Sequence, residues 1–152
     1  MKHLLALLIL CCLGFSAQAQ SSNPSYNKAL ADSLGADAYG MKQYVLVILK
    51  TGTNTTTDKE KLNAYFRGHM ENIGRLAKEG KLVVAGPLGK NDKNYRGIFI
   101  LDAKTVEEAQ KMVETDPAVK AKVFEVELYP WYGSAALPLY LETHSKIEKE
   151  KP

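Results

Sequence analysis

The stretch HMENIGRLAKEGKLVVAGPLG, residues 69–89, contains a helix, a turn and a strand, and the rest of the chain is arranged around it. In this stretch and the residues just before it, one position recurs at steps of four and three residues, the spacing of one face of an α-helix. This face comprises Leu62, Phe66, His69, Ile73 and Leu76. Gly80 suits the left-handed turn that ends a helix, and the apolar run after it stops at Gly86-Pro87. The pattern predicts a helix over about residues 58–79 and a strand over 82–85, with the His69 side chain towards the core.

The flanking sequence predicts three more strands and a second helix. The strands are expected at residues 44–49, 96–101 and 123–129. The second helix begins after Thr105, with Glu108 at the capping-box spacing, and ends at Asp116-Pro117. The resulting order, β-α-β-β-α-β, is a split βαβ unit, so we predict an α+β, ferredoxin-like fold with an antiparallel sheet.

Two helices can cover only one face of such a sheet, yet the first three strands carry apolar side chains on both faces. The second face therefore needs a cover. We expect a two-fold homodimer in which the same sheet face of a second copy supplies it. The alternative is that the segment 130–141 folds back over the sheet.

The first nineteen residues have the charged, apolar and small-residue order of a secretory signal peptide, with cleavage expected after Ala19. Cleavage would remove both cysteines, Cys11 and Cys12, and leave no disulfide or thiolate site. The prediction is a secreted or periplasmic protein with no membrane segment after cleavage. Residues 20–42 then form an N-terminal extension, with a short helix within 26–34, and residues 134–152 form a C-terminal tail whose His144 is expected to be solvated.

Several kinds of chemistry find little support in the sequence. The formal net charge is +3, or +2 once Lys2 is removed with the leader, so charge does not favour nucleic acid as a partner. His69, His144 and the scattered carboxylates show no metal-ligand spacing, and we predict neither a metal nor a cofactor. A small organic molecule is the expected partner besides a second subunit.

His69 and Asp116 are the candidate catalytic residues. An imidazole on the apolar side of a helix needs a hydrogen-bond partner, and Asp116, at the end of the second helix, could approach from the side. Such a pair could act as general base or acid. The alternative reading is a hydrogen-bonded core histidine and an aspartate that caps the next turn. Gly86, Trp131 and Tyr132 are the candidate substrate-binding residues, although the two aromatic residues, in a loop after the fourth strand, could instead be core residues.

Five segments together resemble the YCII-related (YciI-like) family. They are the HMxxIxxLxxxGKLVVAGP segment at 69–87, YRGIFIL at 95–101, TxEEA at 105–109, TDPAVKA at 115–121 and Pro130-Trp131. The resemblance implies a domain over residues 43–133 that belongs to the dimeric α/β-barrel superfamily. It also implies an active site built on a histidine and an aspartate, which correspond to His69 and Asp116.

The leading functional hypothesis is therefore a small-molecule enzyme in which His69 and Asp116 transfer a proton, in a reaction of the isomerase or lyase type. A non-catalytic ligand-binding or structural dimer is the alternative. A barrel that binds haem or handles oxygen is a third possibility, which the colour of the purified protein would reveal.

Overall fold

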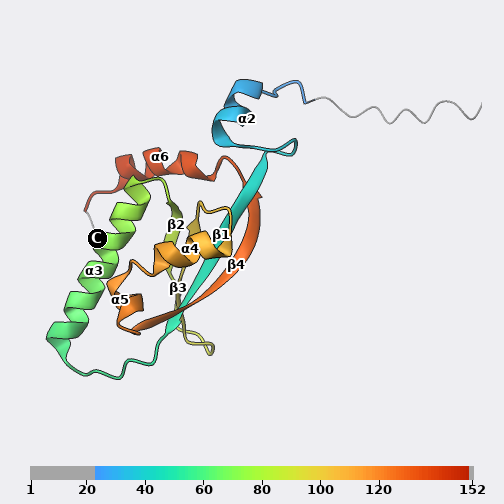
Figure 1. Ribbon diagram of the computed structural model, residues 1–152. Coiled ribbons are helices and arrows are strands. Elements are labelled where there is room, and N and C mark those ends of the chain that lie inside the picture. Colours follow the sequence, from blue (N-terminus) through green and yellow to red (C-terminus); the bar gives the residue numbers. More distant parts are fainter. Residues whose placement is uncertain (1–22, 151–152) are drawn as a thin grey trace, which may run out of the picture.

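The computed structural model describes residues 23–150. The predicted signal peptide lies outside the described residues. The elements that follow are α2 (Lys28–Leu34), β1 (Met41–Thr51), α3 (Lys59–Lys78), β2 (Leu82–Pro87), β3 (Tyr95–Leu101), α4 (Val106–Val113), α5 (Pro117–Lys120), β4 (Phe124–Ser134), the 3-10 turn η1 (Leu137–Leu139) and α6 (Tyr140–Ile147). The domain from β1 to β4 confirms the predicted α+β, β-α-β-β-α-β order (Figure 1).

The four strands form one antiparallel sheet in the order β2-β3-β1-β4, as in ferredoxin-like folds. Helices α3, α4 and α5 lie together on one face of this sheet (Figure 1). The core fills the space between them. Its buried side chains include Val45, Val47, Leu49, Leu76, Leu82, Phe99, Leu101, Val113 and Phe124.

The helix boundaries follow the capping residues of the sequence. Asp58 accepts hydrogen bonds from the backbone N–H groups of Glu60 and Lys61, which satisfies two free donors at the start of α3. Gly80 takes the left-handed conformation, with φ of 70°, directly after that helix. At α4, the Thr105 side chain accepts from the Glu108 N–H, and the Glu108 carboxylate accepts from the Lys104 N–H. Both predicted helices thus begin at a side-chain cap, and α3 is followed by a glycine in the left-handed conformation.

The segment after residue 129 differs from the prediction. It is not a loop, because β4 continues to Ser134 and pairs with the first residues of β1, with Trp131 opposite Tyr44. Pro130 is tolerated there because β4 is an edge strand, where one row of N–H groups has no ladder partner. The tail then forms α6, which crosses the end of the domain near the C-terminus of α3 (Figure 1). The alternative that this segment covers the second sheet face is therefore wrong.

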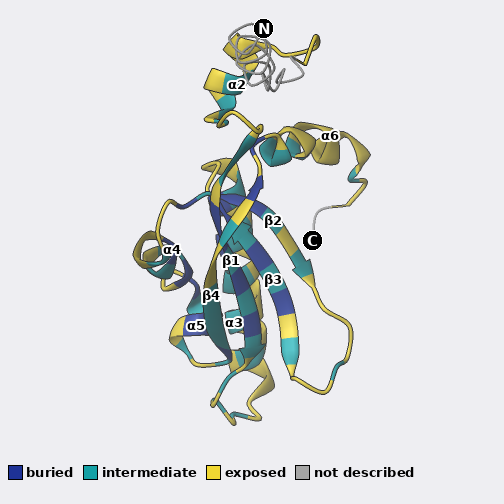
Figure 2. Cartoon of the chain, turned by 90° about the vertical axis from the view of Figure 1, so that its right-hand side faces the viewer, coloured by how far each residue is buried: buried dark blue, intermediate teal, exposed yellow. Residues whose placement is uncertain are grey.

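The second face of the sheet, here called the outer face, carries side chains that alternate with those of the core. Leu46, Ile48, Ile98 and Ile100 are only half-buried, and Tyr129 is 49% exposed. No helix packs over β1 and β3 on this side of the described chain (Figure 2). The strands thus present an apolar surface without a cover in the single chain.

Candidate active site

His69 and Asp116 are joined by a hydrogen bond between Nδ1 and Oδ2, at 2.6 Å. The Asp116 side chain is only 1% exposed and that of His69 is 12% exposed. The other carboxylate oxygen, Oδ1, accepts from the Ala118 N–H at 2.8 Å, so Asp116 also caps α5. Both acceptor atoms of this buried carboxylate are therefore used, which holds its orientation.

The pair forms because α3 and α5 approach closely beside it. Gly68 precedes His69, and the position that a Cβ would take there lies 2.8 Å from Cγ of Pro117, the residue after Asp116. Only a residue without a side chain permits this approach. The backbone itself thus brings the imidazole within reach of the carboxylate.

Aromatic rings fix the plane of the imidazole. Phe99 of β3 lies stacked against His69, with ring centroids 5.9 Å apart and planes inclined by 25°. Phe124 of β4 meets the same ring edge-on at 5.1 Å. The remaining ring nitrogen, Nε2, makes no hydrogen bond to any residue between 23 and 150. With Nδ1 held by Asp116, Nε2 is the atom left for a ligand.

His69 lines a pocket of about 600 Å³ between α3 and the β2-β3 side of the sheet. This volume lies in the range of small-molecule sites. Most of the wall is apolar and comes from Leu49, Met70, Ile73, Ala77, Leu82, Val83, Ala85, Pro87, Phe99 and Phe124. Ala85 pairs with Phe99 and so faces the helices, yet it is exposed, which marks the place where the helices leave β2 uncovered.

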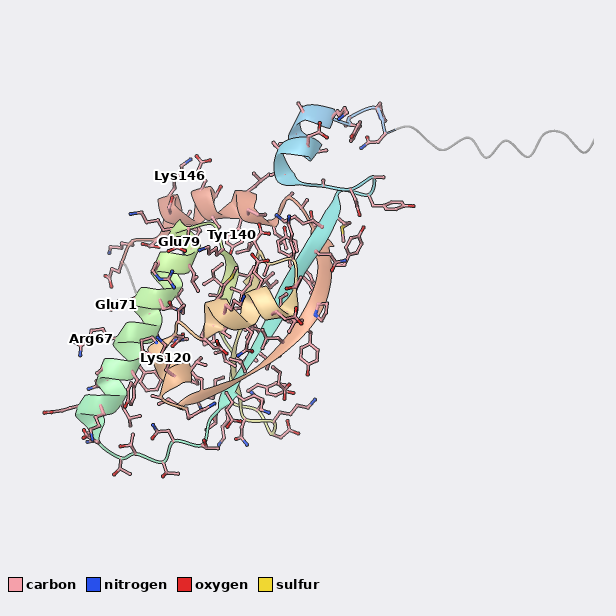
Figure 3. All side chains as sticks on the ribbon, in the orientation of Figure 1. Arg67, Glu71, Glu79, Lys120, Tyr140 and Lys146 are labelled. Atoms are coloured by element: carbon pink, nitrogen blue, oxygen red, sulfur yellow. The ribbon has the colours of Figure 1, made fainter. Side chains whose placement is uncertain are left out.

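Helix α6 closes one end of this pocket through Tyr140, Leu141 and His144. The Tyr140 hydroxyl donates a hydrogen bond to the Val83 carbonyl, and Figure 3 shows Tyr140 pointing from α6 towards β2. Val83 is skipped in the pairing of β2 with β3, which leaves its carbonyl available. Burial raises the pKa of Tyr140, so the hydroxyl keeps the proton that it donates.

The predicted substrate-binding residues do not all meet at this site. Gly86 lines the pocket together with His69. Trp131 instead packs against Tyr44, with ring centroids 5.7 Å apart, on the outer face. The Tyr132 hydroxyl donates to the Asp37 carboxylate, far along the sheet from His69, and this bond is the main reason that the pKa of Asp37 is lowered. We therefore place Trp131 and Tyr132 outside the pocket, because this part of β4 pairs with the start of β1, beyond the end of the pocket.

Three polar pocket residues were not predicted from the sequence: Arg96, Tyr140 and His144. His144 was expected to be solvated, and its side chain is indeed 58% exposed, but it stands at the pocket wall. No local pattern marks Tyr140 or His144, because their role depends on where α6 docks. Arg96 had a weak signal, as a charged residue within an otherwise apolar strand.

Two kinds of feature are missing from the part of the chain that the structure describes. Residues 23–150 contain no group of three or more histidine, cysteine, aspartate or glutamate side chains placed to hold a metal ion. None of their helices has the length and apolar composition needed to cross a bilayer.

Comparison with known protein families identifies a YCII-related domain over residues 43–132, more than half of the 152-residue chain. The chain belongs to the YCII-related family. This agrees with the resemblance found in its sequence motifs, and the match ends at Tyr132, before η1 and α6. The pocket of this YCII-related protein is thus lined partly by residues beyond the family domain.

A comparison with curated proteins finds no significant match. Among solved structures, the chain is similar to 5-chloro-2-hydroxyhydroquinone dehydrochlorinase (TftG) from Burkholderia phenoliruptrix AC1100, in complex with 2,5-dihydroxybenzoquinone. The two are 24% identical over 57% of this chain and 92% of that chain, with a TM-score of 0.40.

Proposed function

We propose that this protein is a small-molecule enzyme in which His69, oriented by Asp116, transfers a proton at Nε2. The observation that carries the proposal is the 2.6 Å bond from His69 Nδ1 to a fully buried carboxylate, at the wall of a ligand-sized pocket. A structural histidine would need the same bond, but it would not need an apolar pocket beside its second nitrogen. This difference favours catalysis over the alternative of a non-catalytic binding or structural protein.

The chemistry follows from the two ring nitrogens. An ionised Asp116 accepts a hydrogen bond from Nδ1–H, which leaves the lone pair on Nε2 free to remove a proton from a bound molecule. The imidazolium that forms is stabilised by the buried carboxylate and can return the proton to another atom of the same molecule. Such a transfer is the central step of isomerase and lyase reactions, and we propose one of these two classes.

The first test is a thermal-shift screen of small lactones, phenols and carboxylic acids. A ligand at about 100 times its Kd stabilises the folded protein by roughly 2.7 kcal/mol, which raises Tm by several degrees. We expect His69→Ala to lose or reduce the shift of a wild-type ligand and to lower its turnover by about 10²- to 10⁴-fold. Tyr39→Ala, at a residue that is 86% exposed, is the control and should behave as wild type. A ligand turned over equally well by His69→Ala would refute the proposal.

We further propose that two copies pair through the outer face, with the sheets packed face to face. The support is the apolar surface of Leu46, Ile48, Ile98 and Ile100, which no element of residues 23–150 covers. Analytical ultracentrifugation should show a dimer for the wild type and a folded monomer for Ile98→Glu. The control, Leu30→Glu on α2, should stay dimeric. A monomeric wild type would exclude this assembly.

We also propose that the protein acts outside the cytoplasm. The support is the order of charged, apolar and small residues in positions 1–19. N-terminal sequencing of the exported protein should begin at or near Gln20, and a retained leader would contradict the proposal.

A further inference from the structure

The pocket beside His69 is apolar but carries basic side chains at three places: His69, Arg96 and His144. No aspartate or glutamate is among the described residues that line it. A ligand in this pocket would therefore meet the positive charge of Arg96, with no carboxylate in the pocket wall itself. An apolar molecule with a negatively charged group suits such a pocket.

Arg96 is the member of this group with a free charge. It makes no side-chain hydrogen bond or ion pair with any residue of the described range 23–150, whereas Nε2 of His144 lies 3.6 Å from a carboxylate oxygen of Glu148. His69 is already engaged by Asp116. A guanidinium is also the side chain best suited to hold a carboxylate, because its planar fork can donate two parallel hydrogen bonds.

Arg96 lies where the pairing of β3 with β1 is irregular. In the pairing of β3 with β1, Gly97 lies opposite Leu49 and Tyr95 lies opposite Lys50, so Arg96 has no partner. Strict alternation would put its side chain on the face opposite to Gly97, towards the outer face. This alternation is interrupted at Tyr95 and Arg96, which together lie opposite Lys50, and Arg96 lines the same pocket as Gly97 and Phe99.

The distance along β3 suits a small ring. Arg96 and Phe99 are three residues apart, so about 10 Å of strand separates their Cα atoms. Phe99 is the residue on which the His69 ring stacks. One molecule with an apolar ring can therefore lie over Gly97 and Phe99, with its acidic group at Arg96 and its ring close to His69.

We infer that this pocket binds small organic acids, with an apolar ring against Phe99 and a carboxylate held by Arg96. The inference rests on the proposed function, since it names the ligand class of the same site. Arg96 acts as the specificity-determining residue, and Nε2 of His69 remains the atom that exchanges a proton with the bound molecule.

Isothermal titration calorimetry with benzoate, and with benzamide as its neutral counterpart, tests whether Arg96 holds a carboxylate in the pocket. The wild type should bind benzoate and prefer it to benzamide. Arg96→Gln should weaken benzoate binding about tenfold or more, as expected when a charged hydrogen bond is lost, and should leave benzamide unchanged. Arg67→Gln is the matched control. Arg67 is exposed, does not line the pocket and points away from the sheet in Figure 3.

A second variant checks where the acid binds. Ala85→Phe would place a ring in the open space beside Phe99 and should abolish benzoate binding. The inference is overturned if the wild type binds neither compound or both alike, if Arg96→Gln binds benzoate as the wild type does, or if Ala85→Phe has no effect.

These outcomes separate the acid site from the reaction. Benzoate binding that depends on Arg96 supports the acid site even if no compound of the screen is turned over. Turnover that depends on His69 but not on Arg96 would uphold the proposed function and overturn the acid site.

Discussion

Replacement of Asp116 with alanine is expected to lower the free energy of unfolding by about 2–4 kcal/mol. This value is the sum of two losses, the cap of α5 and the hydrogen-bond partner of His69. The carboxylate is fully buried, and its two oxygens serve Ala118 and His69 separately. Alanine removes both acceptors at once. Urea unfolding of the two proteins measures the difference directly.

Asp116→Asn separates the structural role of this residue from the catalytic one. The amide oxygen of asparagine can keep the bond to the Ala118 N–H, so the loss of stability should be about 1 kcal/mol or less. The amide nitrogen would then face His69 Nδ1 and favour the tautomer that carries its proton on Nε2. That tautomer cannot act as a base at the pocket, and turnover should fall about 10⁴-fold, as in a serine protease with the same change.

Nitrogen-15 NMR of the imidazole reports which ring nitrogen carries the proton in each variant. Protonation on Nδ1 in the wild type and on Nε2 in Asp116→Asn is the expected pattern. Equal turnover by the wild type and Asp116→Asn would contradict the catalytic role of Asp116. A loss of stability in Asp116→Ala below about 0.5 kcal/mol, the low end for a helix cap alone, would contradict its structural role.

Gly68→Ala should destabilise the protein by about 1–3 kcal/mol, because the added methyl group overpacks the contact between α3 and α5. Its Cβ would lie 2.8 Å from Cγ and 3.2 Å from Cβ of Pro117. Pro117 follows Asp116 directly, so a shift of α5 would also lengthen the bond to His69. We therefore expect this variant to lose ligand binding along with stability.

Gly74→Ala is the matched control within the same helix. A Cβ at Gly74 meets no atom within 4 Å apart from its chain neighbours and the backbone of its own helix, so only helix propensity changes there. This variant should gain about 0.5–1 kcal/mol, the usual advantage of alanine over glycine inside a helix. If urea unfolding showed the same gain for Gly68→Ala, the close approach at Pro117 would not be a constraint on the site.

Local signals in the sequence were enough for the arrangement of helices and strands. The period of Leu62, Phe66, His69 and Ile73 marks α3, the caps Asp58 and Thr105 mark the helix starts, and β-branched runs mark the central strands. Because each of these signals acts over a few residues, the β-α-β-β-α-β order can be predicted without the tertiary structure. The same periodicity predicted that His69 faces inwards, and the place of Asp116 at the end of the second helix made it the candidate partner.

Contacts between distant segments decided the rest. The pairing of β4 with the start of β1 extends the strand through Trp131 and Tyr132, and so removes them from the site. The docking of α6 on the Val83 carbonyl closes one end of the pocket, and Arg96, where the pairing of β3 with β1 is irregular, lines it. None of these contacts leaves a local pattern, since each depends on a partner tens of residues away. The sequence by itself determined the order of the helices and strands and the inward position of His69. Only the packing of those elements decided which side chains share the pocket with His69.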